Sequence, residues 1–179
     1  KVKANRVESE RKGEESKRKK KGKKQCTETH QNVDGVSPVS GRMSSSFGLR
    51  RFFNEQERRS HSGLDIAADE GTPVKATASG TVIDAGDFFF SGNMIYLDHG
   101  QGIISLYAHL SKVSVKPGDI VKQGDIIGNV GQTGRVTGPH LHFAIMTNQK
   151  LIDPVFMLPK DGNSYYQQTI SQTLDKTDK

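Results

Sequence analysis

The chain has 179 residues and a mass of 19.7 kDa, which suits one ordinary domain with extended ends. Only 32% of its residues are hydrophobic and its mean hydropathy is -0.63, so a core along the whole length is excluded. No apolar run approaches the roughly 20 residues that span a bilayer. The sequence begins at Lys1 and not at Met, which indicates a processed product or part of a longer chain and says nothing about export.

The formal charge of +6 is concentrated at the N-terminal end. Residues 1–26 contain 12 Lys and Arg against 4 Glu, whereas the rest carries 14 basic and 16 acidic residues. The run KRKKKGKK at 17–24 repels itself and has no apolar periodicity, so we expect residues 1–36 to form a basic, unfolded arm. Charge attraction leaves open a contact between this arm and an anionic surface. A specific nucleic-acid-binding function is not indicated, because it would depend on the arm alone.

Cys26 is the only cysteine of the chain. A disulfide within the chain and a cluster of thiolate metal ligands are therefore both excluded. Any metal site in this protein must use histidine and carboxylate side chains. A single thiol is compatible with a reducing or an oxidising compartment, so it does not decide between them.

From about Pro38 onward, short runs rich in Val, Ile, Thr and aromatic residues alternate with turn residues. The predicted strands cover residues 72–76, 80–85, 93–98, 103–109, 119–122, 125–130 and 140–147. Thirteen of the 19 glycines lie between Gly63 and Gly138, at the spacing of turns in an antiparallel all-β domain. We therefore predict an all-β antiparallel sandwich or open barrel over residues 37–159, without a helix longer than two turns, and a polar tail over 160–179.

Two groupings of polar residues in this β region could bind a metal. On a strand, His140 and His142 face the same side about 6.6 Å apart, while Leu141 between them points into the core. His61 and Asp65 would lie about 13 Å apart on an extended strand, so a shared metal requires a bend, which Gly63 can supply. Two imidazoles and one carboxylate leave a fourth position open for water, as in a catalytic zinc site. Spacing alone leaves open whether the groupings meet, and each histidine singly could be a hydrogen-bonded core residue.

An ordered series of motifs runs from residue 38 to residue 154. It comprises PVSGRMSSSFGLR at 38–50, HSGLD at 61–65, GTPVKA at 71–76, YAHL at 107–110, GDIIG at 124–128, GQTG at 131–134, GPHLHF at 138–143 and IDP at 152–154. This series resembles the LytM/lysostaphin-type, or β-lytic, zinc metallopeptidases, which cleave bacterial peptidoglycan. The resemblance implies an all-β fold with Gly-rich loops around a zinc groove.

The resemblance also implies a role for each matching histidine and aspartate. His61, Asp65 and His142 would bind one Zn²⁺ ion, with water at the open position. His109 and His140 would flank that water, one of them helping to deprotonate it and both stabilising the oxyanion. The implied activity is zinc-dependent endopeptidase hydrolysis of peptidoglycan peptide crosslinks, in the periplasm or cell envelope. The alternative is a non-catalytic wall-binding or amidase-activating module, which the retention of every expected ligand disfavours.

Several residues outside the predicted zinc site are also expected to have a structural or substrate-binding role. His99 matches the family without a ligand role, so we expect a structural function for it. Three consecutive aromatics at 88–90 cannot all face one core, so at least one should lie at a loop surface. There it could pack against a neighbouring loop or form a wall of a substrate groove. Ala144 replaces an acidic residue of many relatives. The long, Arg-bearing segment 51–61 resembles that of Gram-negative relatives, and this resemblance favours D-alanyl to diaminopimelate bonds over glycine bridges. The oligomeric state is left open.

Overall fold

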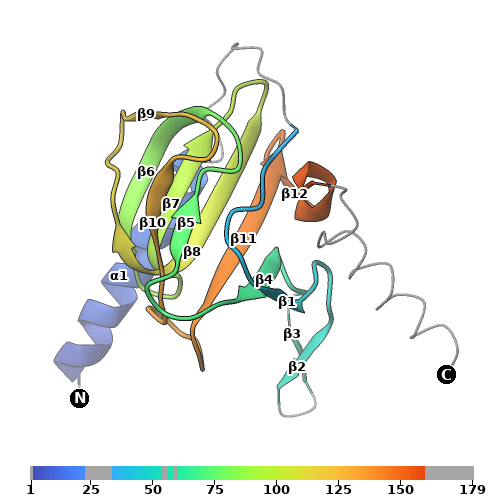
Figure 1. Cartoon of the computed structure of the whole chain (residues 1–179). Helices are drawn as coiled ribbons and strands as arrows, with labels where there is room; N and C mark the ends of the chain where they lie inside the picture. Colours follow the sequence, from blue (N-terminus) through green and yellow to red (C-terminus); the bar gives the residue numbers. More distant parts are fainter. Residues whose placement is uncertain (1, 23–33, 54–55, 59, 160–179) are drawn as a thin grey trace, which may run out of the picture.

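The computed structural model describes residues 2–22, 34–53, 56–58 and 60–159. Its main element is one antiparallel sheet with the strands β1 (Arg42–Ser45), β4 (Leu64–Ala67), β5 (Pro73–Lys75), β6 (Gly80–Phe88), β7 (Gly92–Asp98), β8 (Ile103–Val113), β9 (Ile120–Val121), β10 (Ile126–Val130), β11 (His140–Thr147) and β12 (Lys150–Ile152). The strand order is β1-β4-β11-β8-β7-β6-β9, while β10 pairs with β5 and β8, and β12 pairs with β11 (Figure 1). The predicted antiparallel all-β fold over residues 37–159 is therefore confirmed, and the sheet is open and not closed into a barrel.

Each of the seven predicted strands overlaps an observed one, and β6 and β8 extend beyond their predicted ends. The sequence did not predict β1, β4, β12 or the separate hairpin of β2 (Arg51–Phe53) and β3 (Gln56–Arg58). In β4 the reason is burial on both sides, because Leu64, Asp65 and Ile66 are all buried and no two-residue alternation is visible. This short strand carries one half of the candidate site.

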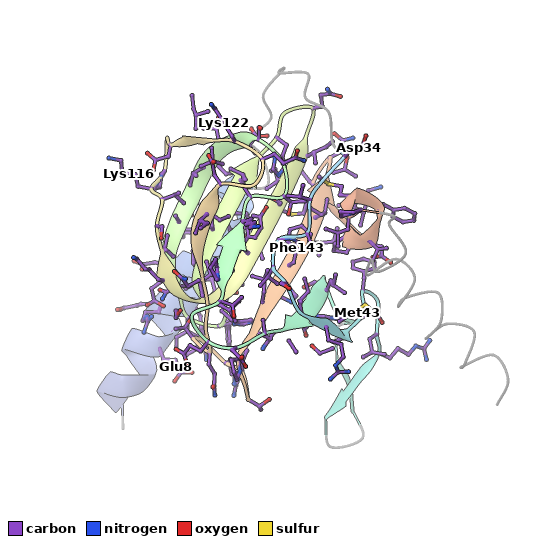
Figure 2. All side chains as sticks on the ribbon, in the orientation of Figure 1. Glu8, Asp34, Met43, Lys116, Lys122 and Phe143 are labelled. Carbon is purple, nitrogen blue, oxygen red and sulfur yellow. The ribbon has the colours of Figure 1, made fainter. Side chains whose placement is uncertain are left out.

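The two faces of the sheet bury different sets of side chains. The main core lies where β5 and β10 fold over the sheet, and it includes Phe143, which Figure 2 shows in the middle of the molecule. A smaller cluster on the other face contains Phe88, Met94, Tyr96, Ile104, Ala108 and Met146. Along β11 the odd positions, such as Leu141, enter the main core, as the sequence predicted. The even positions, His140 and His142 among them, therefore face the opposite side.

The expectation of an unfolded arm is wrong for residues 2–22, which form the α-helix α1 (Val2–Gly22). Lys, Arg and Glu are good helix formers, and Lys12 pairs with Glu8 one turn earlier. The helix has no apolar stripe, and it is held to β6 by ion pairs from Arg11 and Arg18. Figure 1 shows α1 behind the sheet, on the side away from β5 and β10. A helix of 21 residues is therefore present in the segment that was predicted to be unfolded.

The short 3₁₀ helix η1 (Pro154–Met157) is capped at its N-terminus by Asp153, whose side chain accepts a hydrogen bond from Val155 N. Within the described residues, no helix combines the length and the apolar character that a bilayer crossing needs. The predictions that concern Cys26 and the tail over 160–179 lie outside the described residues.

Candidate active site

The strand pair β4–β11 brings the two predicted groupings together. His142 pairs with Asp65 in the antiparallel register, and His140 pairs with Ala67 two positions along. His61 precedes β4, and its ring centroid lies 5.1 Å from that of His142. The bend between His61 and Asp65 passes Gly63, where an added Cβ would lie 2.4 Å from the Phe143 carbonyl oxygen. Gly63 is therefore needed for close approach of the backbone to β11.

Three ligand atoms converge at this point. Asp65 Oδ1 lies 2.7 Å from His142 Nδ1 and 3.0 Å from His61 Nε2, and the two ring nitrogens are 3.2 Å apart. Tetrahedral zinc with ligand distances of 2.0–2.1 Å would set such atoms about 3.3 Å apart. The trio is thus close to the edge lengths of a zinc tetrahedron, and it could hold a metal ion. His61 and Asp65 are buried, and His142 is half-buried.

A backbone carbonyl fixes the tautomer of His61. Its Nδ1 lies 2.8 Å from the Ser46 carbonyl oxygen and 3.1 Å from Ser45 Oγ. Because a carbonyl only accepts, Nδ1–H is the donor and the lone pair of the ring is on Nε2. That lone pair faces a carboxylate oxygen and a second ring nitrogen, an arrangement that a cation stabilises. The donor set therefore fits a divalent metal by its own chemistry.

The protonation states of the trio also suit metal binding. Burial alone raises the pKa of the Asp65 carboxyl, but its contacts with His142 and His61 outweigh this and hold the pKa well below its usual range. Burial lowers the pKa of His142, against the opposing effect of Asp65. Asp65 is accordingly ionised and His142 neutral at pH 7, which are the forms that ligate a metal.

A β-bulge in β8 directs His109 into the site. Tyr107 and Leu110 pair with Ile95 and Asn93, so β8 has one more residue than β7 between these pairs. His109 lies in this bulge with φ 66°, a left-handed conformation that a residue with a Cβ seldom adopts. Its ring centroid is 4.9 Å from that of His140 and 5.9 Å from that of His142. The predicted pair of histidines thus adjoins the ligand trio.

Carbonyl oxygens orient the rings of both flanking histidines. His109 Nδ1–H donates to Thr133 O and His140 Nδ1–H donates to Gly138 O, each over 2.9 Å. In the neutral rings the lone pair is therefore on Nε2, and His140 Nε2 lies 4.0 Å from Asp65 Oδ1. Burial lowers the pKa of His109 to about 4, so this ring is neutral at pH 7. The His109 ring is therefore available as a proton acceptor next to the ligand trio.

An open groove of about 990 Å³ contains all five residues. Phe90 lines it together with Ser91, Arg135, Ala144 and Met146. Phe88 is buried, whereas Phe90 is 38% exposed, so the prediction of one aromatic at the loop surface is confirmed. Ala144 lies on the groove side and is buried, so no acidic side chain acts from that position.

His99 is not part of the groove. Its ring is buried, with Nδ1–H donating to Ser79 O over 2.8 Å and Nε2 lying 2.7 Å from Ser105 Oγ. Ser105 Oγ is in turn 3.1 Å from Tyr107 Oη, which accepts from Thr77 N. This buried chain of hydrogen bonds joins the loop before β6 to β8, so the structural role predicted for His99 agrees with its surroundings.

The orienting carbonyls were not predicted from the sequence. Ser46, Thr133 and Gly138 act through main-chain oxygens, which leave no signal in residue type. Glu15 of α1, which contacts the loop after β6, was also missed, because its segment was predicted to be unfolded.

Comparison with known proteins gives concordant matches. Residues 59–154 match peptidase family M23. A DD-carboxypeptidase/endopeptidase (Mpg) of Neisseria meningitidis is 44% identical over 117 residues, which are 65% of this chain and 27% of that relative. A crystal structure of a Pseudomonas aeruginosa protein described as an M23 peptidase has 39% identity and a TM-score of 0.76, covering 84% of this chain and 62% of that one. A zinc-containing peptidase of Vibrio cholerae has 35% identity and a TM-score of 0.62, covering 70% and 39% of the two chains.

Proposed function

Because the chain belongs to peptidase family M23, we propose that it is a zinc endopeptidase that hydrolyses peptide crosslinks of bacterial peptidoglycan in the periplasm or cell envelope. The observation that carries this proposal is the convergence of three ligand atoms within 3.2 Å of one another, beside the imidazole rings of His109 and His140. We assign residues 37–159 to the catalytic domain. The chain spans about a quarter of the length of the Neisseria relative, so the activity proposed is that of this domain.

In this proposal His61, Asp65 and His142 hold the zinc ion. When bound, zinc polarises a carbonyl group and makes a water molecule more acidic. His109 and His140 present Nε2 lone pairs beside the ion site, and one of them accepts the proton of the attacking water. Once protonated, that ring becomes a donor, so it can stabilise the oxyanion and then pass the proton to the leaving amine.

The groove also offers a means of recognising the substrate. Among its lining residues in the described part of the chain, Arg135 is the only lysine or arginine. In a bond between two D-centres, the residue on the amine side carries a carboxylate next to the scissile amide, whereas a glycine bridge carries none there. An arginine guanidinium binds a carboxylate through two parallel hydrogen bonds. Arg135 therefore supports D-alanyl to diaminopimelate crosslinks as the substrate.

Two soluble substrates test this proposal. The zinc-loaded chain should cleave a stem-peptide dimer joined by a D-alanyl–diaminopimelate bond and should leave a pentaglycine-bridged dimer uncut. Chelation should abolish cleavage and added zinc should restore it. Cleavage of the pentaglycine bridge at a similar rate would contradict the substrate, and zinc-independent cleavage would contradict the metal mechanism.

Contact with anionic surfaces is a separate part of the proposal. Lys17 and Lys20 are exposed on α1. We propose that these lysines attract anionic envelope polymers or lipid headgroups through charge alone, without recognising a particular structure. Adhesion to anionic vesicles should fall in a Lys17→Gln/Lys20→Gln variant, and the difference should vanish as salt shortens the screening length to about 8 Å and below.

A further inference from the structure

The helix α1 is attached to the sheet next to the groove wall. Arg18 donates two hydrogen bonds to the Asp84 carboxylate, over 3.0 and 2.5 Å, and its Cζ lies 4.0 Å from the centre of the Phe88 ring. Arg11 forms a second ion pair with Asp87. These contacts fix α1 along the end of β6. The residues that follow β6, Phe89 to Ser91, lead directly into the groove.

Glu15 is the contact of α1 that matters most for the groove. Glu15 is only 5% exposed. Its carboxylate accepts hydrogen bonds from Phe90 N over 2.9 Å and from Ser91 Oγ over 3.4 Å. Burying a carboxylate is costly unless its oxygens are bonded, and here they bond to the wall of the groove. Both acceptor contacts are made to residues that line the groove. Glu15 therefore connects the helix to the substrate side of the loop.

Cations from α1 and from the loop that carries Arg135 lie close to the aromatic pair in this wall. Lys12 Nζ is 5.1 Å from the ring centre of Phe89 and 5.5 Å from that of Phe90. Arg135 Cζ lies 6.0 Å from the ring centre of Phe90, and Arg135 N donates to the Phe90 carbonyl oxygen. Cations are attracted to aromatic faces at such distances. The position of Phe90 is thus set by α1 together with the loop that carries Arg135.

The same wall is bonded to a residue of the proposed catalytic pair. Ser91 O accepts a hydrogen bond from His109 N over 3.0 Å. Gly134 packs against the loop so closely that an added Cβ would lie 2.6 Å from Phe90 O, and its φ of 81° is one that glycine adopts readily. His109 also donates to Thr133 O. Phe90, Ser91, His109 and the loop of Arg135 therefore form one connected unit.

We propose that α1 is part of the substrate-binding wall, and that Glu15 is a positioning residue that holds Phe90 and Ser91 where the substrate peptide binds. This inference rests on the proposed peptidase function. The helix lies outside residues 59–154, the part that matches the family. Loss of the Glu15 contacts frees the wall on the helix side, while His109 keeps its bond to Thr133. The effect should therefore fall on substrate binding more than on the chemical step.

Three single substitutions in the full chain separate this role from a general loss of structure. Glu15→Ala removes both acceptor contacts, whereas Glu15→Gln keeps the length of the side chain and one acceptor oxygen. Glu14→Ala alters an exposed glutamate of the same helix. With the D-alanyl–diaminopimelate dimer as substrate, Glu15→Ala should raise KM about five- to tenfold, the scale of one charge-assisted hydrogen bond, with kcat and zinc content little changed. Glu15→Gln should restore KM to within about twofold of the parent value, and Glu14→Ala should match the parent. Equal KM values for Glu15→Ala and Glu14→Ala would overturn the proposal.

Hydrogen exchange gives a second readout that needs no turnover. The Phe90 amide should exchange slowly in the parent chain and in Glu15→Gln and Glu14→Ala, and rapidly in Glu15→Ala. Unchanged protection of Phe90 in Glu15→Ala would refute the anchoring role even if the chain hydrolysed nothing. Absence of hydrolysis in the zinc-loaded parent would instead count against the proposed function, so the two failures are distinguishable.

Discussion

Asp65 and His142 face each other across the antiparallel pair of β4 and β11, with Asp65 Oδ1 2.7 Å from His142 Nδ1. This register joins two motifs that are 77 residues apart in the sequence. A slip of one residue would turn His142 toward the core and Leu141 toward the groove, because side chains alternate along a strand. The hydrophobic pattern of β11 therefore protects the geometry of the site.

Replacing a proposed ligand should remove the metal without unfolding the domain. Asp65→Ala should lower zinc affinity by more than the roughly 10- to 100-fold that loss of an orienting partner costs, because the carboxylate contacts both ring nitrogens. Asp69→Ala, which changes an exposed aspartate just after β4, is the matched control. Metal analysis of the two purified variants checks this. One equivalent of zinc retained by Asp65→Ala would refute the ligand assignment.

The flanking histidines should be separable from the ligands. His140→Ala should keep its zinc and lose about 100-fold or more in kcat, the usual scale of a missing acid–base group. The reason is that His140 bonds to Gly138 O and lies 4.0 Å from Asp65, outside the trio. Zinc content and hydrolysis are measured on the same preparation. A normal rate in this variant would show that His140 has no role in proton transfer.

The buried ring of His99 should make stability depend on pH. Burial lowers the pKa of His99, so the folded chain binds a proton there less readily than the unfolded chain, whose histidine pKa is about 6.5. This contribution to stability is complete above about pH 6.5 and is lost as the pH falls below it, at no more than about 1.4 kcal/mol per pH unit. Urea denaturation at several pH values should show a steeper acid loss for the parent than for His99→Gln, both loaded with zinc. Parallel curves for the two proteins would disprove this linkage.

The ion pairs of α1 should contribute unequally to stability. Arg18→Ala should lower the free energy of unfolding by about 1 kcal/mol, since Arg18 bonds to a largely buried Asp84 carboxylate and packs on Phe88. Arg11→Ala should cost less than about 0.5 kcal/mol, because both members of its pair with Asp87 are exposed. Urea denaturation of the two variants decides between them. Equal and negligible losses would mean that α1 contributes nothing to the stability of the domain.

The sequence predicted the strands well where one face is buried and the other is not. In β11 the alternation of His140, Leu141 and His142 was visible, and the structure reproduces it. What could not be seen is the register between β4 and β11, which depends on pairing between distant segments. The bulge that turns His109 into the site also depends on strand pairing, because β8 has one more residue than β7 between the paired positions Ile95–Tyr107 and Asn93–Leu110.

The helix α1 was missed for a different reason. Its residues lack an apolar stripe, which is the usual sign that a helix packs on a core. The contacts that hold it are polar, with Glu15 bonded to Phe90 N and Arg18 bonded to Asp84. The sequence pattern alone predicts that such residues are solvated, because the group to which each of them bonds lies more than 60 positions away in the sequence.

Mass spectrometry of digested peptidoglycan shows whether the domain cuts peptide crosslinks with the help of zinc. Isolated peptidoglycan is incubated with the zinc-loaded chain and, in parallel, with zinc-loaded His140→Ala. Crosslinked dimers should be converted to monomers by the parent chain and far more slowly by His140→Ala. The glycan strands should stay intact, since hydrolysis of a sugar bond needs two suitably spaced carboxyl groups. Crosslinks that remain intact after long incubation, with one equivalent of zinc confirmed in the parent chain, would contradict it and favour a non-catalytic, amidase-activating module.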